Sequence, residues 1–271
     1  MTVTTQLPLY QVDAFTDRPF AGNPAAVVLL EQWPADTLLQ AIAAENNLAE
    51  TAYLVPAGSR WELRWFTPTT EVVLCGHATL ASAFVLWHCR REAGDEIEFD
   101  TRHSGRLRVT READWLQLDL PAHDIAPSEP PAALVDAMGV VPAEVRAGPN
   151  WLLRYPDAAT IRSLEPDPRA LSRLPDRGVI VTAPGDEAGV DFVSRYFAPN
   201  FGVDEDPVTG SAHCMLAPFW AARLGRDSLA ARQLSRRGGF LRCEIAGDRV
   251  LVAGQAVLYM TGAITVPEDR P

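Results

Sequence analysis

Runs of alternating or β-branched apolar residues predict many short β-strands in the first half of the chain. These runs cover residues 9–15, 25–30, 51–55, 61–66, 96–99, 105–110 and 115–120. Two other stretches, 34–45 and 79–91, repeat apolar residues at helical spacing. We therefore expect the first half to be a mostly antiparallel sheet wrapped around one apolar helix.

The second half has a similar order of predicted elements, after a proline-rich connection at 121–131. Strands are expected at 150–155, 178–182, 190–197, 241–245, 249–252 and within 255–266, and helices at 132–138 and from Met215 onwards. We predict an α+β fold with two pseudo-symmetric halves, residues 1–122 and 123–271, each a curled sheet around a central helix. The terminal strand region could cross to the first half.

Two short segments share a pattern that indicates an internal duplication. Phe66-Thr-Pro68 lies ten residues before Gly76, which continues as Gly76-His-Ala78. Phe197-Ala-Pro199 lies thirteen residues before Gly210, which continues as Gly210-Ser-Ala212. An apolar helical pattern follows each glycine, so each copy is expected to present one helix start.

A helix start attracts anions, because its first backbone N–H groups lack intrahelical acceptors and the helix dipole is positive there. We therefore expect a small carboxylate-bearing substrate to be bound at the two helix starts. The residues predicted to bind it are Gly76, Ala78, Thr209, Gly210, Ser211 and Ala212. The alternative is that both are ordinary capped helices whose resemblance is a matter of chance.

The charge balance argues against nucleic acid and anionic membranes as partners. The chain has 24 Lys and Arg against 35 Asp and Glu in 271 residues, a net charge of −11. Its four cysteines form no Cys-x-x-Cys pair, no apolar run is long enough for a membrane helix, and the N-terminus lacks a leader pattern. We therefore expect a soluble, reduced, cytoplasmic protein.

Familiar cofactor and nucleophile motifs do not occur in the sequence. It has no phosphate-binding loop, no well-placed dinucleotide fingerprint and no nucleophile elbow. The five histidines lack metal-ligand spacing. We therefore expect no cofactor and no metal, which leaves a cofactor-independent enzyme or a binding protein.

Two residues of the first half are candidates for proton transfer. Glu50 lies between apolar residues where a predicted helix meets a strand, and partial desolvation there would make its carboxylate a stronger base. The alternative is an edge residue that faces solvent. His77 follows Gly76 at a predicted helix start, where the dipole favours a neutral imidazole. The alternative is a packed or capping histidine.

Two further candidates are weaker. Asp206 lies in an acidic cluster before the second helix start and could orient a substrate group, although capping is the more usual role of such a residue. Cys75 precedes Gly76, and a thiol at a helix start could act as a base. Its alternative role is that of a small apolar residue in the core.

Several segments taken together resemble the phenazine-biosynthesis isomerase-like (PhzF-like) family, which shares the diaminopimelate epimerase fold. They are Val12-Asp-Ala-Phe15, Gly22-Asn-Pro24, Asn47-Leu-Ala-Glu-Thr51, Phe66-Thr-Pro68, Gly76-His77, Glu205-Asp-Pro-Val-Thr-Gly-Ser-Ala212 and Gly254-Gln-Ala256. The resemblance implies two halves with the site in the cleft between them, and usually a homodimer. It also implies that Glu50 is the acid/base and that His77 and Asp206 assist.

The sequence departs from the family pattern at two points. Ala49 stands where the family commonly has serine, which removes one possible hydrogen bond to the substrate. The related epimerases use two thiols, and the second of these aligns with Thr209, so inversion by two thiols is not expected.

From these residues and this resemblance we expect a cofactor-independent isomerase. Glu50 would move a proton between two carbons on one face of a small carboxylate-bearing metabolite. One alternative is a racemase or epimerase that uses Cys75, and another is a non-catalytic protein that binds a metabolite. The resemblance does not imply phenazine production itself.

Overall fold

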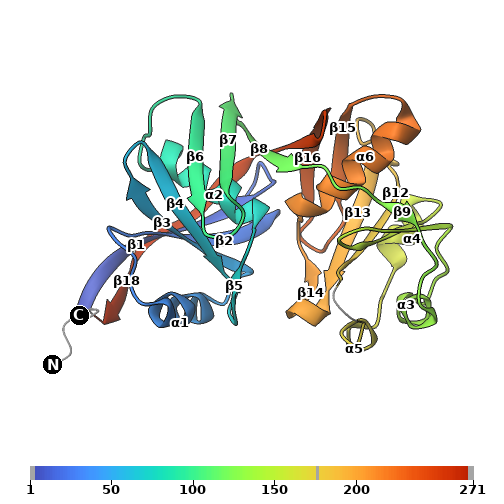
Figure 1. The fold of residues 1–271 in the computed structure, drawn as a ribbon, viewed down its shortest axis with the longest axis horizontal. Helices are drawn as coiled ribbons and strands as arrows, with labels where there is room; N and C mark the ends of the chain where they lie inside the picture. The colour runs from blue at the N-terminus through green and yellow to red at the C-terminus, as the bar shows by residue number, and fades with distance from the viewer. Residues whose placement is uncertain (1–3, 175–176, 268–271) are drawn as a thin grey trace. The chain divides into compact units, whose positions relative to one another are not determined.

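The computed structural model describes residues 4–174 and 177–267, and Figure 1 shows their helices and strands. The chain divides into two compact units. Unit 1 comprises residues 1–119 and 254–271, and unit 2 comprises residues 120–253. The sequence places the boundary at residue 122 and allows the terminal strand region to cross to the first half, and the structure assigns 254–271 to unit 1.

The sheet of unit 1 curls around one helix. Its strands are β1 (Thr4–Ala14), β2 (Asn23–Leu29), β3 (Glu50–Ala57), β4 (Arg60–Phe66), β5 (Glu71–Val72), β6 (Glu96–Thr101), β7 (Arg106–Glu112), β8 (Trp115–Pro121) and β18 (Ala256–Pro267). They pair in the order β18–β1–β2–β3–β4–β6–β7–β8, and β5 pairs with the end of β4. The pairs β2–β3 and β4–β6 are parallel, and the others are antiparallel.

The central helix of unit 1 is α2 (Gly76–His88), which contacts β1, β2, β3 and β7. Every residue from Gly76 to Trp87 is buried, as expected for a helix that is apolar on all sides. A second helix, α1 (Asp36–Asn46), packs Leu39, Ile42 and Ala43 against the sheet and lies outside it (Figure 1). The predicted first half, a mostly antiparallel sheet around one apolar helix, is confirmed.

Unit 2 repeats the strand pairing of unit 1. Its elements are β9 (Ala126–Pro127), α3 (Ala132–Met138), β10 (Glu144–Ala147), β11 (Trp151–Arg154), α4 (Ala158–Ser163), α5 (Pro168–Leu171), β12 (Val179–Pro184), β13 (Phe192–Ala198), η1 (Pro199–Phe201), β14 (Val203–Asp206), η2 (Gly210–Ala212), α6 (His213–Leu224), β15 (Ser228–Gln233), β16 (Gly239–Ala246) and β17 (Arg249–Gly254). The order is β9–β10–β11–β12–β13–β15–β16–β17, and β14 pairs with β13.

The parallel pairs of unit 2, β11–β12 and β13–β15, occupy the same places as β2–β3 and β4–β6 in unit 1. The buried helix α6 corresponds to α2 and contacts β15 and β16. The predicted α+β fold with two similar halves is therefore confirmed. Among the described residues, no helix is both long enough and apolar enough to cross a membrane.

Three local predictions differ from the structure. The helix predicted at 79–91 spans Gly76–His88, so the small residues that precede the apolar run already belong to it. The second helix begins at His213, after a 3₁₀ turn at Gly210–Ala212. Strand β15 was not predicted, because Ser228–Gln233 contains no β-branched residue and the strand forms through its pairing with β13 and β16.

Candidate active site

Glu50 lies at the corner between α1 and β3, as the sequence predicts. Helix α1 ends at Asn46, and its C-cap residue Asn47 is in the left-handed conformation with φ 50°. Glu50 is the first residue of β3. The Asn46 amide donates to the Thr51 hydroxyl at 3.1 Å and fixes the turn. The Glu50 side chain is 16% exposed, so its carboxylate is mostly withdrawn from water.

The Glu50 carboxylate meets His77, the second residue of α2. Glu50 Oε2 lies 3.1 Å from His77 Nε2, and the His77 side chain is only 5% exposed. The two atoms are close enough to form an ion pair. They are not aligned for a hydrogen bond, and both are among the buried polar atoms without a hydrogen bond. The two candidates predicted from separate parts of the sequence therefore lie side by side.

Two more side chains approach the other ring nitrogen of His77. Asn23 Nδ2 lies 3.1 Å from His77 Nδ1, and Cys75 Sγ lies 3.5 Å from the same atom. Asn23 is fully buried and begins β2, directly after Gly22, whose φ of 65° and contact with the Ala14 carbonyl leave no room for a side chain. In the sequence, Asn23 is noticeable only as part of the family segment Gly22-Asn-Pro24. Its position between Gly22 and Pro24, two residues that restrict the backbone, is the feature of the sequence that could have indicated a fixed side chain.

The histidine holds its proton more firmly than the sequence predicts. Burial alone lowers the pKa of His77, but the Glu50 carboxylate and the contact with Cys75 outweigh it and raise the pKa well above the ordinary value. Burial and the Glu50 charge raise the pKa of Cys75 to about 11, so its thiol is neutral near neutral pH. Glu50 is therefore the anion that stabilises the imidazolium. The expectation of a neutral imidazole was wrong, because the helix dipole is weaker than a carboxylate at 3.1 Å.

The Asn23 amide can serve both protonation states of His77. With Nδ2 toward the ring it donates to Nδ1, which fits a neutral imidazole that carries its proton on Nε2. Rotation of the amide by half a turn presents Oδ1 instead, which accepts from the Nδ1–H of an imidazolium. The raised pKa of His77 favours this second orientation.

Glu50, Cys75 and His77 also have the composition of a metal site. One ligand atom from each lies within 4.8 Å of the other two. A metal would have to displace protons from both Cys75 and His77, whose pKa values are raised. The cluster is therefore better suited to hold and move protons than to bind a cation near neutral pH.

The backbone predicted to bind an anion in unit 1 forms the first turn of α2. Gly76, His77 and Ala78 follow the N-cap residue Cys75, and the first intrahelical bond of this turn joins the Thr79 N–H to the Cys75 carbonyl. The Ala78 N–H interacts with the Cys75 sulfur. Gly76 and Ala78 are thus beside the Glu50 and His77 pair, and their binding role stays a prediction.

The other predicted residues lie in unit 2 and form a separate network. The Thr209 hydroxyl donates to Asp206 Oδ2, and the Thr209 N–H donates to Gln233 Oε1 at 2.9 Å. Gln233 Nε2 donates to the Asp206 carbonyl at 2.8 Å and is fully buried. Gly210, Ser211 and Ala212 form the 3₁₀ turn that leads into α6. Sequence reasoning missed Gln233, which lies on the unpredicted strand β15.

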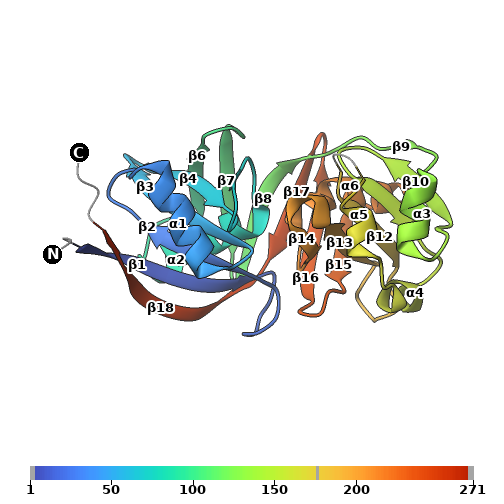
Figure 2. The same ribbon diagram turned by 90° about the horizontal axis from the view of Figure 1, so that it is seen from below.

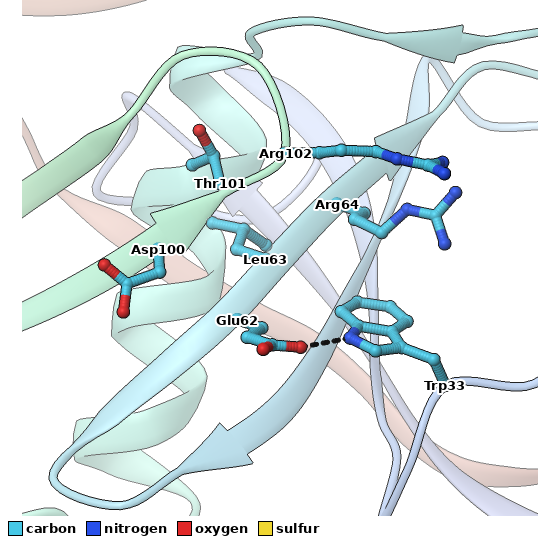
Figure 3. Close-up of a pocket in the computed structure, with 7 residues that line it drawn as sticks. All are labelled: Trp33, Glu62, Leu63, Arg64, Asp100, Thr101 and Arg102. Carbon is cyan, nitrogen blue, oxygen red and sulfur yellow. Dashed lines mark hydrogen bonds between the residues drawn. The ribbon is translucent and has the colours of Figure 1, made fainter.

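A separate pocket of about 410 Å³ in unit 1 contains none of the predicted site residues. Figure 3 shows Trp33 and Glu62 at its edge, where the indole N–H donates to the carboxylate. Arg64 points into the same region, bonded to Glu71 and Asp36 at 2.8 Å. Two carboxylates already pair with the Arg64 guanidinium, so it is not available to bind an anion in this pocket. The pocket therefore does not replace the predicted anion site.

Taken together, the duplicated sheet-and-helix units and the buried carboxylate–imidazole pair define an α+β protein of the diaminopimelate epimerase-like fold with a candidate acid/base site. The chain belongs to the phenazine biosynthesis-like family, whose model, described as "Phenazine biosynthesis-like protein", matches residues 12–262.

Similar proteins cover almost the whole chain. An uncharacterized isomerase of Pseudomonas aeruginosa is 53% identical over 260 residues, which are 96% of this chain and 98% of that protein. A PhzF-family crystal structure from Enterococcus faecalis has 44% identity and a TM-score of 0.92, and the match covers 96% of this chain and 99% of that one. A putative PhzC/PhzF protein from Clostridium difficile has 40% identity and a TM-score of 0.89 over 95% and 99% of the two chains. The family and these relatives support an isomerase.

Proposed function

We propose that this protein is a cofactor-independent isomerase that moves a proton between two carbons of a small carboxylate-bearing metabolite, with Glu50 as the acid/base. The observation that carries the proposal is the approach of Glu50 Oε2 to within 3.1 Å of His77 Nε2 in a mostly buried site. The relatives named isomerases support the reaction class.

In the proposed reaction the Glu50 carboxylate first removes a proton from a carbon of the substrate. The C–H electron pair is then delocalised toward the substrate carboxylate or a conjugated group, and the imidazolium of His77 stabilises the developing negative charge. Glu50 returns the same proton to a second carbon on the same face, so no atom is gained or lost. One base on one face gives a proton shift rather than an inversion of configuration.

Asn23 keeps His77 in place during this cycle. When Glu50 accepts the proton, His77 loses its anionic neighbour and the substrate becomes the anion. The Asn23 amide can accept from Nδ1–H throughout, which keeps Nε2–H directed at the reacting groups. Asn23 is thus proposed as a positioning residue.

The remaining predicted residues keep their proposed roles. The backbone of Gly76 and Ala78 would bind the substrate carboxylate, as would that of Thr209, Gly210, Ser211 and Ala212. Asp206 would orient a polar group of the substrate. The Asp206–Thr209–Gln233 network supports this proposal because it fixes the carboxylate and the turn in one geometry.

The alternative of a racemase depends on Cys75. Its sulfur lies 3.5 Å from His77, so the thiol is within reach of the proton-transfer pair. A thiol with a pKa of about 11 can act as a base only after it loses a proton that it holds tightly near neutral pH. The structure therefore favours Glu50 over Cys75 as the base.

The test is hydrogen exchange at carbon, measured by mass spectrometry or NMR in deuterated water over a panel of cyclic and amino carboxylic acids. We expect at least one compound to isomerise or to exchange a C–H with the wild-type protein, and Glu50→Gln to slow this about 100- to 10,000-fold. Glu45→Gln, on the exposed face of α1, is the matched control and should keep the wild-type rate. Equal turnover by Glu50→Gln and wild type would refute the assignment. Tight binding of a compound without any exchange would favour the non-catalytic alternative.

A further inference from the structure

An arginine–glutamate pair with the same geometry precedes the central helix of each unit. In unit 1, Arg64 Nε and Nη2 donate to the two carboxylate oxygens of Glu71, both at 2.8 Å. In unit 2, Arg195 Nε and Nη2 donate to the two oxygens of Glu205, at 2.7 and 2.9 Å. Paired bonds between charged groups are stronger and more directional than single bonds between neutral groups. We call these pairs the β5 fork and the β14 fork, after the strands that carry the glutamates.

The surroundings of the two forks also match. The Arg64 and Arg195 side chains are 9% and 12% exposed, so both ion pairs are largely withdrawn from the water that weakens surface pairs. Each guanidinium also lies over the phenylalanine two residues later in its strand. The distance from Cζ to the ring centre is 5.1 Å for Phe66 and 4.8 Å for Phe197. Both units thus use the same arrangement at the same place in their framework.

The segment between each fork and its helix start has one length in both units. Glu71 lies five residues before Gly76, and Glu205 lies five residues before Gly210. The turn between arginine and glutamate is three residues longer in unit 2, where it includes the 3₁₀ helix at Pro199–Phe201. The difference in length therefore falls before the glutamate, and the part that leads into the helix is unchanged. This is expected if the fork fixes the entry to the helix.

The rest of the entry to α2 is held by few contacts in the described part of unit 1. Strand β5 contains two residues and pairs with β4 at two positions, opposite Trp65 and Phe66. Residues 73–75 then belong to no helix or strand, and Val73 is 63% exposed. The Ser104 hydroxyl donates to the Val73 carbonyl at 2.6 Å, but this bond is exposed. The β5 fork is therefore the buried anchor of this entry.

The β5 fork is connected to both members of the candidate acid/base pair. Glu71 is six residues before His77, and the chain between them passes through the N-cap of α2. The third donor of the arginine, Arg64 Nη1, binds Asp36, the first residue of α1, at 2.8 Å. Helix α1 lies against β3 and β4 (Figure 2) and ends four residues before Glu50. One guanidinium thus holds the two chain segments that place Glu50 and His77.

We propose that Arg64 is a positioning residue of the active site: through the β5 fork and Asp36, it sets the spacing between the Glu50 carboxylate and the His77 ring. This proposal rests on the proposed function, because it gives Arg64 its role through the same pair. A displacement of about 1 Å between reacting groups can lower a rate about 100-fold. Arg64 therefore affects catalysis through Glu71 and Asp36 rather than by contact with the substrate.

Two variants disturb the β5 fork without changing the charge of the protein. Arg64→Lys keeps a cation but cannot donate in parallel to both oxygens of one carboxylate. Glu71→Asp keeps the carboxylate on a shorter side chain, and it decides the question if Arg64→Lys does not fold. Arg195→Lys is the matched control, because it breaks the equivalent fork in unit 2. Thermal melting followed by circular dichroism identifies the folded variants and measures the stability that each fork contributes.

The readout is the titration of the His77 ring by ¹⁵N NMR, which needs no substrate. We expect the His77 pKa to be lower in Arg64→Lys and Glu71→Asp than in the wild type, because Glu50 is no longer held 3.1 Å from the ring. Arg195→Lys should titrate like the wild type. A role in stability alone would lower the melting temperature of all three variants and leave the titration unchanged. A wild-type titration in the folded variants of the β5 fork, or an equal shift in Arg195→Lys, would overturn the proposal.

Turnover separates this proposal from the proposed function. With a compound that exchanges a C–H in the deuterated-water panel, we expect Arg64→Lys to lower kcat about 10- to 100-fold and to change KM less. If Glu50→Gln abolishes exchange while Arg64→Lys keeps the wild-type kcat, the proposed function stands and the positioning role is refuted. If no compound exchanges, the proposed function fails, and a lowered His77 pKa in Arg64→Lys still shows that Arg64 sets the geometry of the pair.

Discussion

The two units share one strand order, but the histidines at their central helix starts have opposite properties. His77 in α2 faces the Glu50 carboxylate, and its pKa is raised well above the ordinary value, even though burial opposes this. His213 begins α6, is fully buried, and its Nδ1 lies 2.9 Å from the Thr209 carbonyl. Burial lowers its pKa to about 4, and the hydrogen bond that its Nδ1–H donates to the Thr209 carbonyl offsets this only in part.

This contrast shows that the anion beside the ring, rather than the helix start, decides the protonation state. Both rings are buried at the beginning of a helix, so burial and the helix dipole act in the same direction on each. Strand β3 places Glu50 beside the first ring. The equivalent register position on β12 is Val179, which offers no charge. The two units have similar frameworks, and one carboxylate distinguishes the histidine of the first from that of the second.

The largest effect we predict concerns stability in acid. The pKa of His213 is depressed in the folded state, so the unfolded chain binds a proton between pH 6.5 and about 4 that the folded chain does not. Stability is therefore present above pH 6.5 and is lost as pH falls, on the order of 3 kcal/mol. His213→Gln should remove much of this loss, measured by urea denaturation at pH 7 and pH 4.5. An unchanged pH dependence would contradict a buried neutral His213.

The second prediction tests the positioning of His77. Asn23→Ala removes the acceptor for the imidazolium Nδ1–H, which costs about 1–3 kcal/mol for a buried group. We expect kcat to fall about 10- to 100-fold and the His77 pKa, seen in the pH–rate profile, to move down. Asn23→Asp keeps an acceptor and should restore the high pKa. A loss confined to KM, with an unchanged pH profile, would show that Asn23 does not act through His77.

A smaller effect tests the alternative in which Cys75, rather than Glu50, is the base. Cys75→Ala removes a neutral buried thiol that lies 3.5 Å from His77, and we expect the exchange rate to change by less than about fivefold. Its buried counterpart Cys214, in α6, supplies the control variant Cys214→Ala. Loss of exchange in Cys75→Ala alone, with inversion of the product, would support a racemase instead.

The smallest expected effect is that of metal removal. Glu50, Cys75 and His77 could coordinate a cation only after Cys75 and His77 lose protons that they hold near neutral pH. Dialysis against EDTA should therefore leave the reaction rate unchanged, and added zinc should inhibit by competing with protons. Activity lost with EDTA and recovered with zinc would show that the cluster is a metal site.

The sequence predicted the fold because each half has a strong local pattern. Alternating strands, an apolar helix and the repeated Gly76 and Gly210 segments are all visible in the chain. Strand β15 was missed because Ser228–Gln233 has little strand propensity, and its pairing with β13 and β16 is not local. Such tertiary pairing leaves no signal in the segment itself.

The sequence pointed to Glu50 and His77 as candidate residues, but it did not predict the protonation state of His77. Glu50 and His77 were identified from a helix-to-strand corner and a helix start, which are local features. Asn23 was missed as a partner because it is 54 residues from His77 in the chain. The raised pKa of His77 depends on a 3.1 Å distance to Glu50 that no spacing in the sequence gives.

The most direct test of the central claim is ¹⁵N NMR of the His77 ring in the wild type and in Glu50→Gln, titrated from pH 5 to pH 9. Because Glu50 holds the proton on His77, we predict an imidazolium at pH 7.5 in the wild type and a neutral ring in Glu50→Gln. His213 provides the internal reference and should be neutral in both proteins down to about pH 5. A His77 ring that titrates near its ordinary pKa in the wild type, or identically in the two proteins, would contradict the account.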